Sequence, residues 1–111
     1  MIRFALEAGR LRVQGHAGYA PKGADIVCAG VSALVGALEG YLTRRQAEGT
    51  LPQLALHRTP DGTELRFAGD AGAQGALDAV ELGLTQIAAQ YPEYVQRCAF
   101  AEGGAERAGQ A

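Results

Sequence analysis

Cysteine is scarce in this chain, with only Cys28 and Cys98 among 111 residues. In a reducing cytoplasm such thiols normally stay reduced, so a structural disulfide between them is not expected. An excess of basic residues is also missing, since the formal net charge is −2 and the pI is about 5.6. Proteins that bind nucleic acid usually carry a basic footprint, so no direct nucleic-acid partner is expected.

Long apolar runs are missing as well. No stretch approaches the roughly 20 apolar residues of a bilayer-spanning helix. The first ten residues, MIRFALEAGR, also lack the sustained apolar core of a signal peptide. We therefore expect a cytoplasmic protein with no membrane partner. Because the chain is 48% hydrophobic and 20% charged, we expect one globular domain over residues 1–100, with a disordered tail over 101–111.

Two kinds of periodicity predict the secondary structure. Apolar residues alternate with polar ones over residues 2–7 and 10–14, which predicts an antiparallel hairpin. A long apolar segment after Asp25 predicts a helix with that aspartate as N-cap and Gly49 as its end. Apolar residues spread around this helix, so we expect it to be buried on more than one side.

The pattern then repeats. A turn at residues 59–63 separates predicted strands at 53–58 and 64–68. A second helix is predicted over 72–90, and a short terminal strand within 93–100. The order hairpin, helix, hairpin, helix predicts an α+β fold (ββαββα, with a short terminal strand) in two layers, a sheet packed on two helices.

A candidate site lies where the first hairpin meets the first helix. His16 closes the second strand, and Cys28 falls in the first helical turn after Asp25. The N–H groups and dipole of a helix N-terminus favour a thiolate, and a nearby imidazole can take the thiol proton and return it to a leaving amine. Ser32, one helical turn beyond Cys28, can hydrogen-bond into such a site. Three glycines flank or lie within the loop between histidine and cysteine, and we interpret them as its hinges: Gly15, just before His16, and Gly18 and Gly23 inside the loop.

Each of these residues also has a plain structural interpretation. From spacing alone, Cys28 is more simply explained as a small buried hydrophobe, and His16 as a strand-end surface residue. Asp25 either orients His16 or only caps the helix, and Ser32 either supports the site or bonds its own backbone. The remaining pair, His57 and Cys98, has no motif around it, and the four residues together show no zinc-like spacing.

Several motifs gather around the candidate dyad. They are Gly15-His16-Ala17, then Gly23, Asp25-Ile26-Val27-Cys28-Ala29 and Val31-Ser32-Ala33-Leu34, with Gln90-Tyr91-Pro92-Glu93-Tyr94-Val95 further on. In these motifs the chain resembles the ribosomal-processing cysteine protease family, Prp, over nearly its whole length up to about Val95. Neither Cys98 nor the tail beyond Phe100 belongs to this signature.

The resemblance implies a cytosolic endopeptidase that trims the N-terminal extension of large ribosomal subunit protein twenty-seven, cutting after a short hydrophobic segment that ends in aromatic residues. It implies Cys28 as nucleophile and His16 as catalytic histidine, with Asp25 and Ser32 as supporting polar residues. It also implies a homodimer. No metal and no organic cofactor are expected.

Two other functions fit the same residues. The first is a ribosome-assembly factor that binds the same extension without cutting it. The second is a thiol-redox domain that uses Cys28, although no second cysteine stands two residues away as in a thioredoxin-like couple. Tight peptide binding without turnover would favour the assembly factor. An unusually oxidisable thiol and indifference to loss of His16 would favour the redox domain, whereas the protease predicts that His16→Ala abolishes cleavage.

Overall fold

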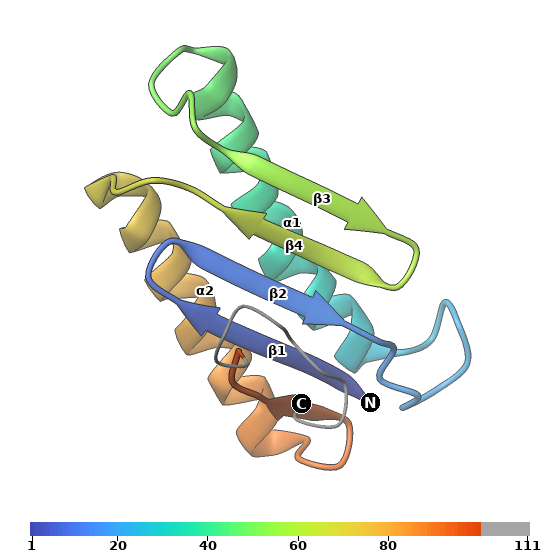
Figure 1. Cartoon of the computed structure of the whole chain (residues 1–111). Helices are drawn as coiled ribbons and strands as arrows, with labels where there is room; N and C mark the ends of the chain where they lie inside the picture. The colour runs from blue at the N-terminus through green and yellow to red at the C-terminus, as the bar shows by residue number, and fades with distance from the viewer. Residues whose placement is uncertain (101–111) are drawn as a thin grey trace.

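A computed structural model describes residues 1–100 of the chain, so the expected tail over 101–111 lies outside the described residues. The fold is α+β, as the periodicities predict: five strands form one open sheet with two helices on one of its faces (Figure 1). In chain order the elements are β1 (Ile2–Glu7), β2 (Arg10–Gln14), α1 (Ile26–Ala47), β3 (Ala55–Thr59), β4 (Gly62–Arg66), α2 (Ala71–Gln90) and β5 (Val95–Arg97).

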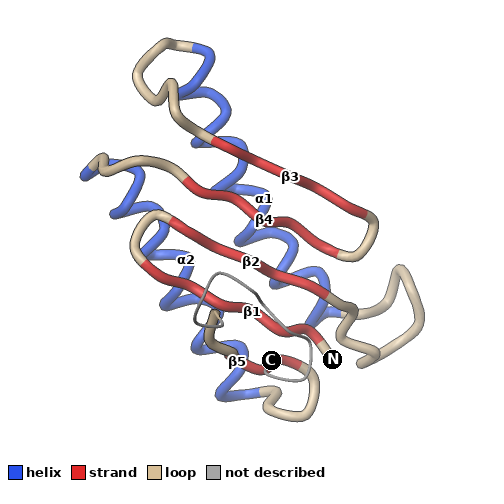
Figure 2. Tube along the Cα trace, viewed as in Figure 1, coloured by secondary structure: helices blue, strands red, loops and turns tan. Residues whose placement is uncertain are grey.

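The order of strands across the sheet is β3-β4-β2-β1-β5, and only the β1–β5 pair is parallel. The two hairpins therefore lie side by side, with β4 paired to β2, as Figure 2 shows. This pairing sets Gly62 opposite Gln14. The turn between β3 and β4 consequently lies beside the end of β2, where the loop to α1 begins.

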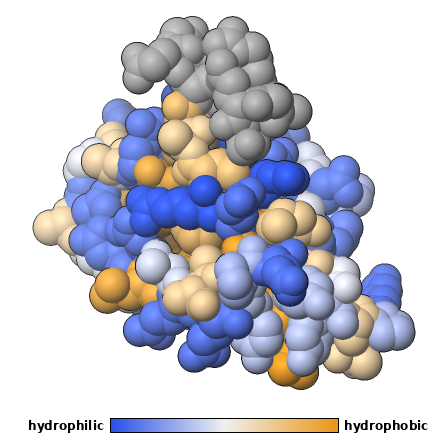
Figure 3. Space-filling view, turned by 90° about the horizontal axis from the view of Figure 1, so that it is seen from below, coloured by the Kyte–Doolittle hydropathy of each residue, from blue (hydrophilic) through white to orange (hydrophobic). Residues whose placement is uncertain are grey.

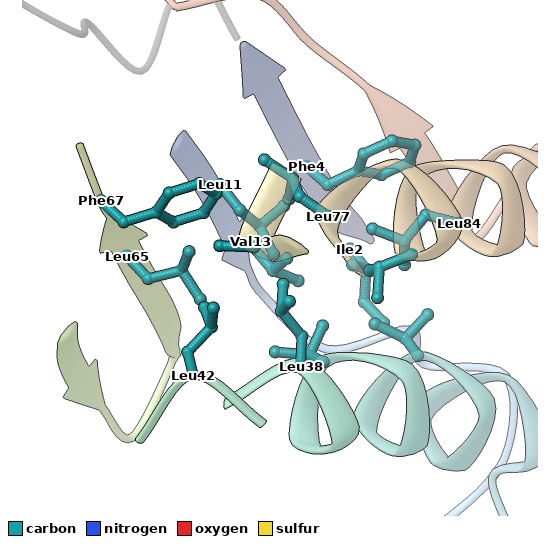
Figure 4. Packing of buried hydrophobic residues seen from close by; sticks show 14 of the residues in the cluster. Ile2, Phe4, Leu11, Val13, Leu38, Leu42, Leu65, Phe67, Leu77 and Leu84 are labelled. Atoms are coloured by element: carbon teal, nitrogen blue, oxygen red, sulfur yellow. The ribbon is translucent and has the colours of Figure 1, made fainter. Parts of the chain in front are cut away.

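The core lies between the sheet and the helices (Figure 4). Strand residues of one parity point into it because side chains alternate between the two faces of a strand. The fully buried Phe4, Leu11 and Leu65 come from the sheet, and Leu38 and Leu84 come from the helices. One core thus holds both layers together, which fixes where α1 starts relative to the strand ends.

Helix α1 corrects two of the expectations. Its buried residues form one stripe toward the sheet, whereas Ile26 on the other side is 60% exposed, so the helix is not buried on more than one side. The apolar residues on the outer side are mostly alanine and glycine, and a Cβ built at Gly40 would meet nothing within 4 Å. The buried stripe is Val27, Val31, Val35, Leu38, Glu39 and Leu42.

The expectation that no segment is apolar enough for a membrane span is also wrong. By length and composition alone, α1 meets that criterion, with a mean hydropathy of 1.6 over its best window. Its alanines and glycines count as apolar in that average although they add little surface. In this structure the buried stripe of α1 packs on the sheet.

The β5 edge of the molecule has a mixed surface. Seen from that side, hydrophilic residues predominate and hydrophobic ones form separate small patches (Figure 3). The edge strand β5 has only three residues, two of them exposed. Short, polar edges discourage further strand pairing, so this edge ends the sheet.

Candidate active site

A cleft of about 390 Å³ opens between α1, the end of β2 and the β3–β4 turn. His16, Cys28 and Ser32 all line it, so the structure brings these three candidates to one surface. Gly15 lines it too. Asp25, Gly18 and Gly23 do not line the cleft. The residues that line it are Ile2, Val13, Gly15, His16, Cys28, Val31, Ser32, Val35, Gly36, Glu39, Arg58, Thr59, Pro60, Asp61, Gly62 and Thr63.

Cys28 is the third residue of α1, in the first turn after the N-cap residue Asp25. Asp25 has extended backbone angles, and its Oδ1 accepts a hydrogen bond from the Cys28 backbone N–H at 2.9 Å. The thiol therefore sits where the helix dipole and the remaining N–H groups of the first turn favour negative charge. Cys28 and Cys98 are both free thiols.

The second oxygen of Asp25 holds the loop that precedes the helix. Oδ2 accepts from the backbone N–H of Tyr19 at 3.0 Å and of Ala20 at 3.4 Å. The Cys28 N–H, followed by these loop N–H groups, lowers the pKa of Asp25 below its ordinary value, against an opposing effect of burial. Of the two roles considered for Asp25, the structure shows the cap, and within residues 1–100 no hydrogen bond or ion pair joins it to His16.

His16 stands at the mouth of the cleft, with 70% of its side chain exposed. Two backbone hydrogen bonds fix the chain here: the Met1 amino group donates to the His16 carbonyl, and the Gly15 N–H donates to the Asp61 carbonyl at 2.8 Å. Gly15 has φ +95°, and a Cβ there would collide with the Met1 carbonyl. Glycine is thus required at this position for conformation and for space.

The carboxylate nearest to His16 is Asp61, which the sequence had shown only as a turn residue. Its Oδ1 lies 3.8 Å from His16 Nε2, and both side chains are exposed. Asp61 comes from the β3–β4 turn and reaches His16 because β4 pairs with β2. Nothing in the local pattern Thr59-Pro60-Asp61-Gly62 identifies this contact, since it depends on strand order.

Within residues 1–100 no hydrogen bond joins Cys28 to His16. The two side chains share the cleft wall, and catalytic hydrogen bonds are often long in enzymes without substrate. Ser32 lies one turn along α1 and is exposed to the same cleft. The arrangement provides a thiol, an imidazole and a hydroxyl around one open cleft.

The loop between His16 and Cys28 is attached at its centre. The Tyr19 ring packs edge-on against Tyr91 and Tyr94, with ring centroids 5.6 and 5.2 Å apart. Gly18 and Gly23 have φ values of +70° and +92°, and a Cβ at either would meet nothing within 4 Å. Their backbone conformation favours glycine, and their role as hinges stays a prediction.

The other candidate ligands do not meet. His57 belongs to β3 and Cys98 follows β5, and these strands are the two opposite edges of the sheet. In the part of the chain that the structure describes, no three histidine, cysteine, aspartate or glutamate residues are grouped to hold a metal ion.

Comparison with known proteins bears on the same residues. Residues 1–96 match the family model for the cysteine protease Prp. The ribosomal processing cysteine protease Prp of Mycoplasma pneumoniae is 33% identical over 99 residues, which are 86% of this chain and 91% of that protein.

Solved structures with the same fold include the essential ribosomal processing protease Prp of Staphylococcus aureus. Its complex with a covalently linked product peptide has a TM-score of 0.70 and 21% identity. Its complex with a substrate peptide has a TM-score of 0.64 and 20% identity. Each comparison covers 88% of this chain and 96% of the other. The match over residues 1–96, together with the Mycoplasma relative, shows that this chain belongs to the Prp family of ribosomal-processing cysteine proteases.

Proposed function

We propose that this chain is a cytoplasmic endopeptidase that removes the N-terminal extension of large ribosomal subunit protein twenty-seven. The observation that carries the proposal is the shared cleft, in which Cys28 at the start of α1 and His16 at the end of β2 face one space. The Staphylococcus aureus relative has been seen with a substrate peptide and with a covalently linked product peptide, which supports a peptide in this cleft.

The first half of the reaction forms a thioester. His16 takes the proton from the Cys28 thiol, and Sγ attacks the carbonyl carbon of the scissile peptide bond. When the tetrahedral intermediate collapses, the C–N bond breaks and the imidazolium returns its proton to the leaving amine. The Asp61 carboxylate lies beside His16 on the exposed side of the cleft, 3.8 Å from Nε2.

The second half hydrolyses the thioester. His16 takes a proton from water, whose oxygen attacks the acyl carbon, and the released thiolate recovers the proton. The oxyanion of each intermediate needs donors, yet the backbone N–H of Cys28 is already bonded to Asp25. We therefore assign oxyanion stabilisation to the positive end of the α1 dipole and to Ser32, which lines the cleft.

The test uses the precursor of the ribosomal protein from the same organism. Incubation with the wild-type protein should shorten the precursor by its extension, as measured by intact mass. Cys28→Ala and His16→Ala should each lower the rate by at least about 10³-fold while the circular dichroism spectrum stays unchanged. Undiminished cleavage by Cys28→Ala would refute the protease. Tight binding of the precursor without turnover by the wild-type protein would favour the assembly factor instead.

We also propose a homodimer, as the resemblance implies. The outer side of the helical layer supports it, because Ile26 and Leu82 are 60% and 65% exposed there. Exposed apolar residues of this size favour association when they lie on one surface. Sedimentation equilibrium should give twice the chain mass of 11.5 kDa, and Leu82→Lys should shift it toward the single-chain mass. A single-chain mass for the wild-type protein at micromolar concentration would refute the dimer.

A further inference from the structure

The end of the cleft that lies away from His16 carries a charged cluster. Glu39 of α1 is the one charged residue that is buried within residues 1–100. Its Oε1 accepts from the Arg58 guanidinium, and its Oε2 accepts from the Thr63 hydroxyl at 2.7 Å. Arg58 and Thr63 are directly paired across β3 and β4. A buried carboxylate is thus satisfied by two neighbouring strand residues, and all three line the cleft.

The cleft follows α1 from the thiol to this cluster. Cys28, Ser32 and Gly36 recur every fourth residue, which places them on one face of the helix, and Glu39 continues that face. A Cβ at Gly36 would meet nothing within 4 Å, so the middle of the path is open. Eleven residues at 1.5 Å each put Glu39 about 16 Å along the helix from Cys28. An extended peptide covers that length with about five residues.

Arg58 is able to bind something beyond Glu39. Its side chain is 64% exposed, whereas that of Glu39 is 7% exposed. A guanidinium carries five N–H groups, and within residues 1–100 the Arg58 side chain donates only to Glu39, which leaves N–H groups for an incoming acceptor. Because Glu39 accepts from Nη2 of the guanidinium, the side chain is oriented before any ligand arrives. Such preorganisation lowers the entropic cost of binding.

We propose that Glu39 and Arg58 form a remote subsite that selects the substrate, in which Arg58 binds an oxygen acceptor of the peptide about five residues from the cleaved bond. Arg58 is the specificity-determining residue, and Glu39 is a positioning residue that acts through it. The proposal rests on the proposed function, since it needs the peptide to run from Cys28 along α1. The acceptor is either an acidic side chain or a main-chain carbonyl of the peptide.

The test compares long and short peptides. The probes are peptides from the ribosomal protein precursor with eight residues on each side of the cleavage point, and versions cut to three residues on one side or the other. Arg58→Ala should raise KM by about tenfold for the long peptide with little change in kcat, since hydrogen bonds to charged groups are worth about that factor. The rise should vanish on the truncation that removes the contacted residue. Arg66→Ala, on an exposed arginine of β4 outside the cleft, is the matched control.

A second pair of variants guards against unfolding, because Arg58→Ala removes the cationic partner of a buried carboxylate. Arg58→Lys keeps the charge opposite Glu39 with fewer donors and should raise KM for the long peptide by about threefold. Glu39→Gln should do the same, and in the double variant Arg58→Ala/Glu39→Gln the two effects should not add, because they remove one interaction.

The outcomes separate the two proposals. If the wild-type protein cleaves the peptides through Cys28 but Arg58→Ala behaves like Arg66→Ala, or raises KM equally for long and short peptides, the remote subsite is refuted and the protease stands. Should the wild-type protein cleave none of the peptides, the proposed function itself fails. Replacing an acidic residue of the long peptide at that distance by alanine abolishes the Arg58 effect if the acceptor is a side chain, and preserves it if the acceptor is a main-chain carbonyl.

Discussion

The two helices of this molecule begin with the same device and use it differently. Asp25 caps α1 by accepting from the Cys28 N–H at 2.9 Å, and Asp70 caps α2 by accepting from the Ala73 N–H at 2.8 Å. Both carboxyl groups have a pKa below the ordinary value. The residues that donate to the two caps differ in their surroundings, since Cys28 lines the cleft whereas Ala73 is fully buried in the core.

The two carboxylates also differ in the further partners that they bind. Asp70 forms a two-point ion pair with Arg45 near the end of α1, at 2.8 and 3.1 Å, so its cap fastens one helix to the other. Within residues 1–100 no ion pair joins Asp25 to a cation, and its Oδ2 accepts from the loop N–H groups of Tyr19 and Ala20. One cap therefore serves the packing of the fold, and the other fixes the loop next to the thiol.

Removing each cap should produce the largest difference between the two helices in activity and stability. Asp25→Ala frees the loop beside Cys28, so we expect cleavage to slow by about 10- to 100-fold because small displacements of reacting groups have effects of that size. Asp70→Ala loses the cap and leaves Arg45 without its carboxylate partner, so we expect the larger fall in melting temperature, about 5 °C or more, with cleavage little changed. Peptide cleavage and thermal unfolding of both variants measure the contrast.

The matched controls are Asp25→Asn and Asp70→Asn, because asparagine is a good N-cap without the charge. Each should retain most of what the alanine variant loses at its helix terminus. Equal losses of activity from Asp25→Ala and Asp70→Ala would contradict the division of roles between the two caps.

The local part of this arrangement could be predicted from the sequence. Asp25 was recognisable as an N-cap and Cys28 as a first-turn residue, since both properties depend on neighbours within four positions. The hairpins and both helices follow from apolar periodicity, and the strand boundaries shifted by only a few residues, with β3 at Ala55–Thr59 in place of 53–58.

The non-local part could not be predicted. Asp61 reaches His16 because β4 pairs with β2. Arg58 reaches Glu39 because α1 packs on the face of the sheet that carries this pair (Figure 1). Strand order is set by the packing of the whole core, and no residue within the turn Thr59-Pro60-Asp61-Gly62 encodes it. The burial of α1 was overestimated for the same reason: alanine and glycine are compatible with a buried or an exposed side, and packing decides.

Glycine substitutions sharpen the comparison where the two helices touch. A Cβ at Gly83 of α2 would lie 2.7 Å from a terminal carbon of Leu34 in α1, whereas a Cβ at Gly75 of the same helix meets nothing within 4 Å. Gly75→Ala should stabilise the protein by about 0.5–1 kcal/mol through helix propensity. Gly83→Ala gains the same propensity but must displace Leu34, so it should be about 1 kcal/mol less stable than Gly75→Ala.

Urea unfolding at equilibrium measures both glycine variants on one scale. Gly40→Ala in α1, also in open space, is the matched control for the first helix and should behave like Gly75→Ala. If Gly83→Ala were as stable as Gly75→Ala, Leu34 would move away without loss and the contact would not limit how closely the helices approach.

The charge on each cap should have the smallest effect, which acid removes at both positions and salt removes mainly at Asp70. A carboxyl group whose pKa is lower in the folded state stabilises the fold above its unfolded value, near 3.8 for both aspartates, and the stabilisation is lost as the pH falls through the folded pKa. The melting temperature of the wild-type protein should therefore exceed that of Asp25→Asn or Asp70→Asn at pH 5–7, and the difference should shrink below about pH 4.

The lowered pKa has a different main cause at each cap. It is the Arg45 side chain at Asp70 and the Cys28 N–H at Asp25. Because salt screens an ion pair more than a hydrogen bond from a neutral donor, 0.5 M salt at pH 6 should reduce the Asp70 advantage and spare that of Asp25. Equal salt sensitivity at both positions would mean that the charge on Arg45 adds nothing to the second cap.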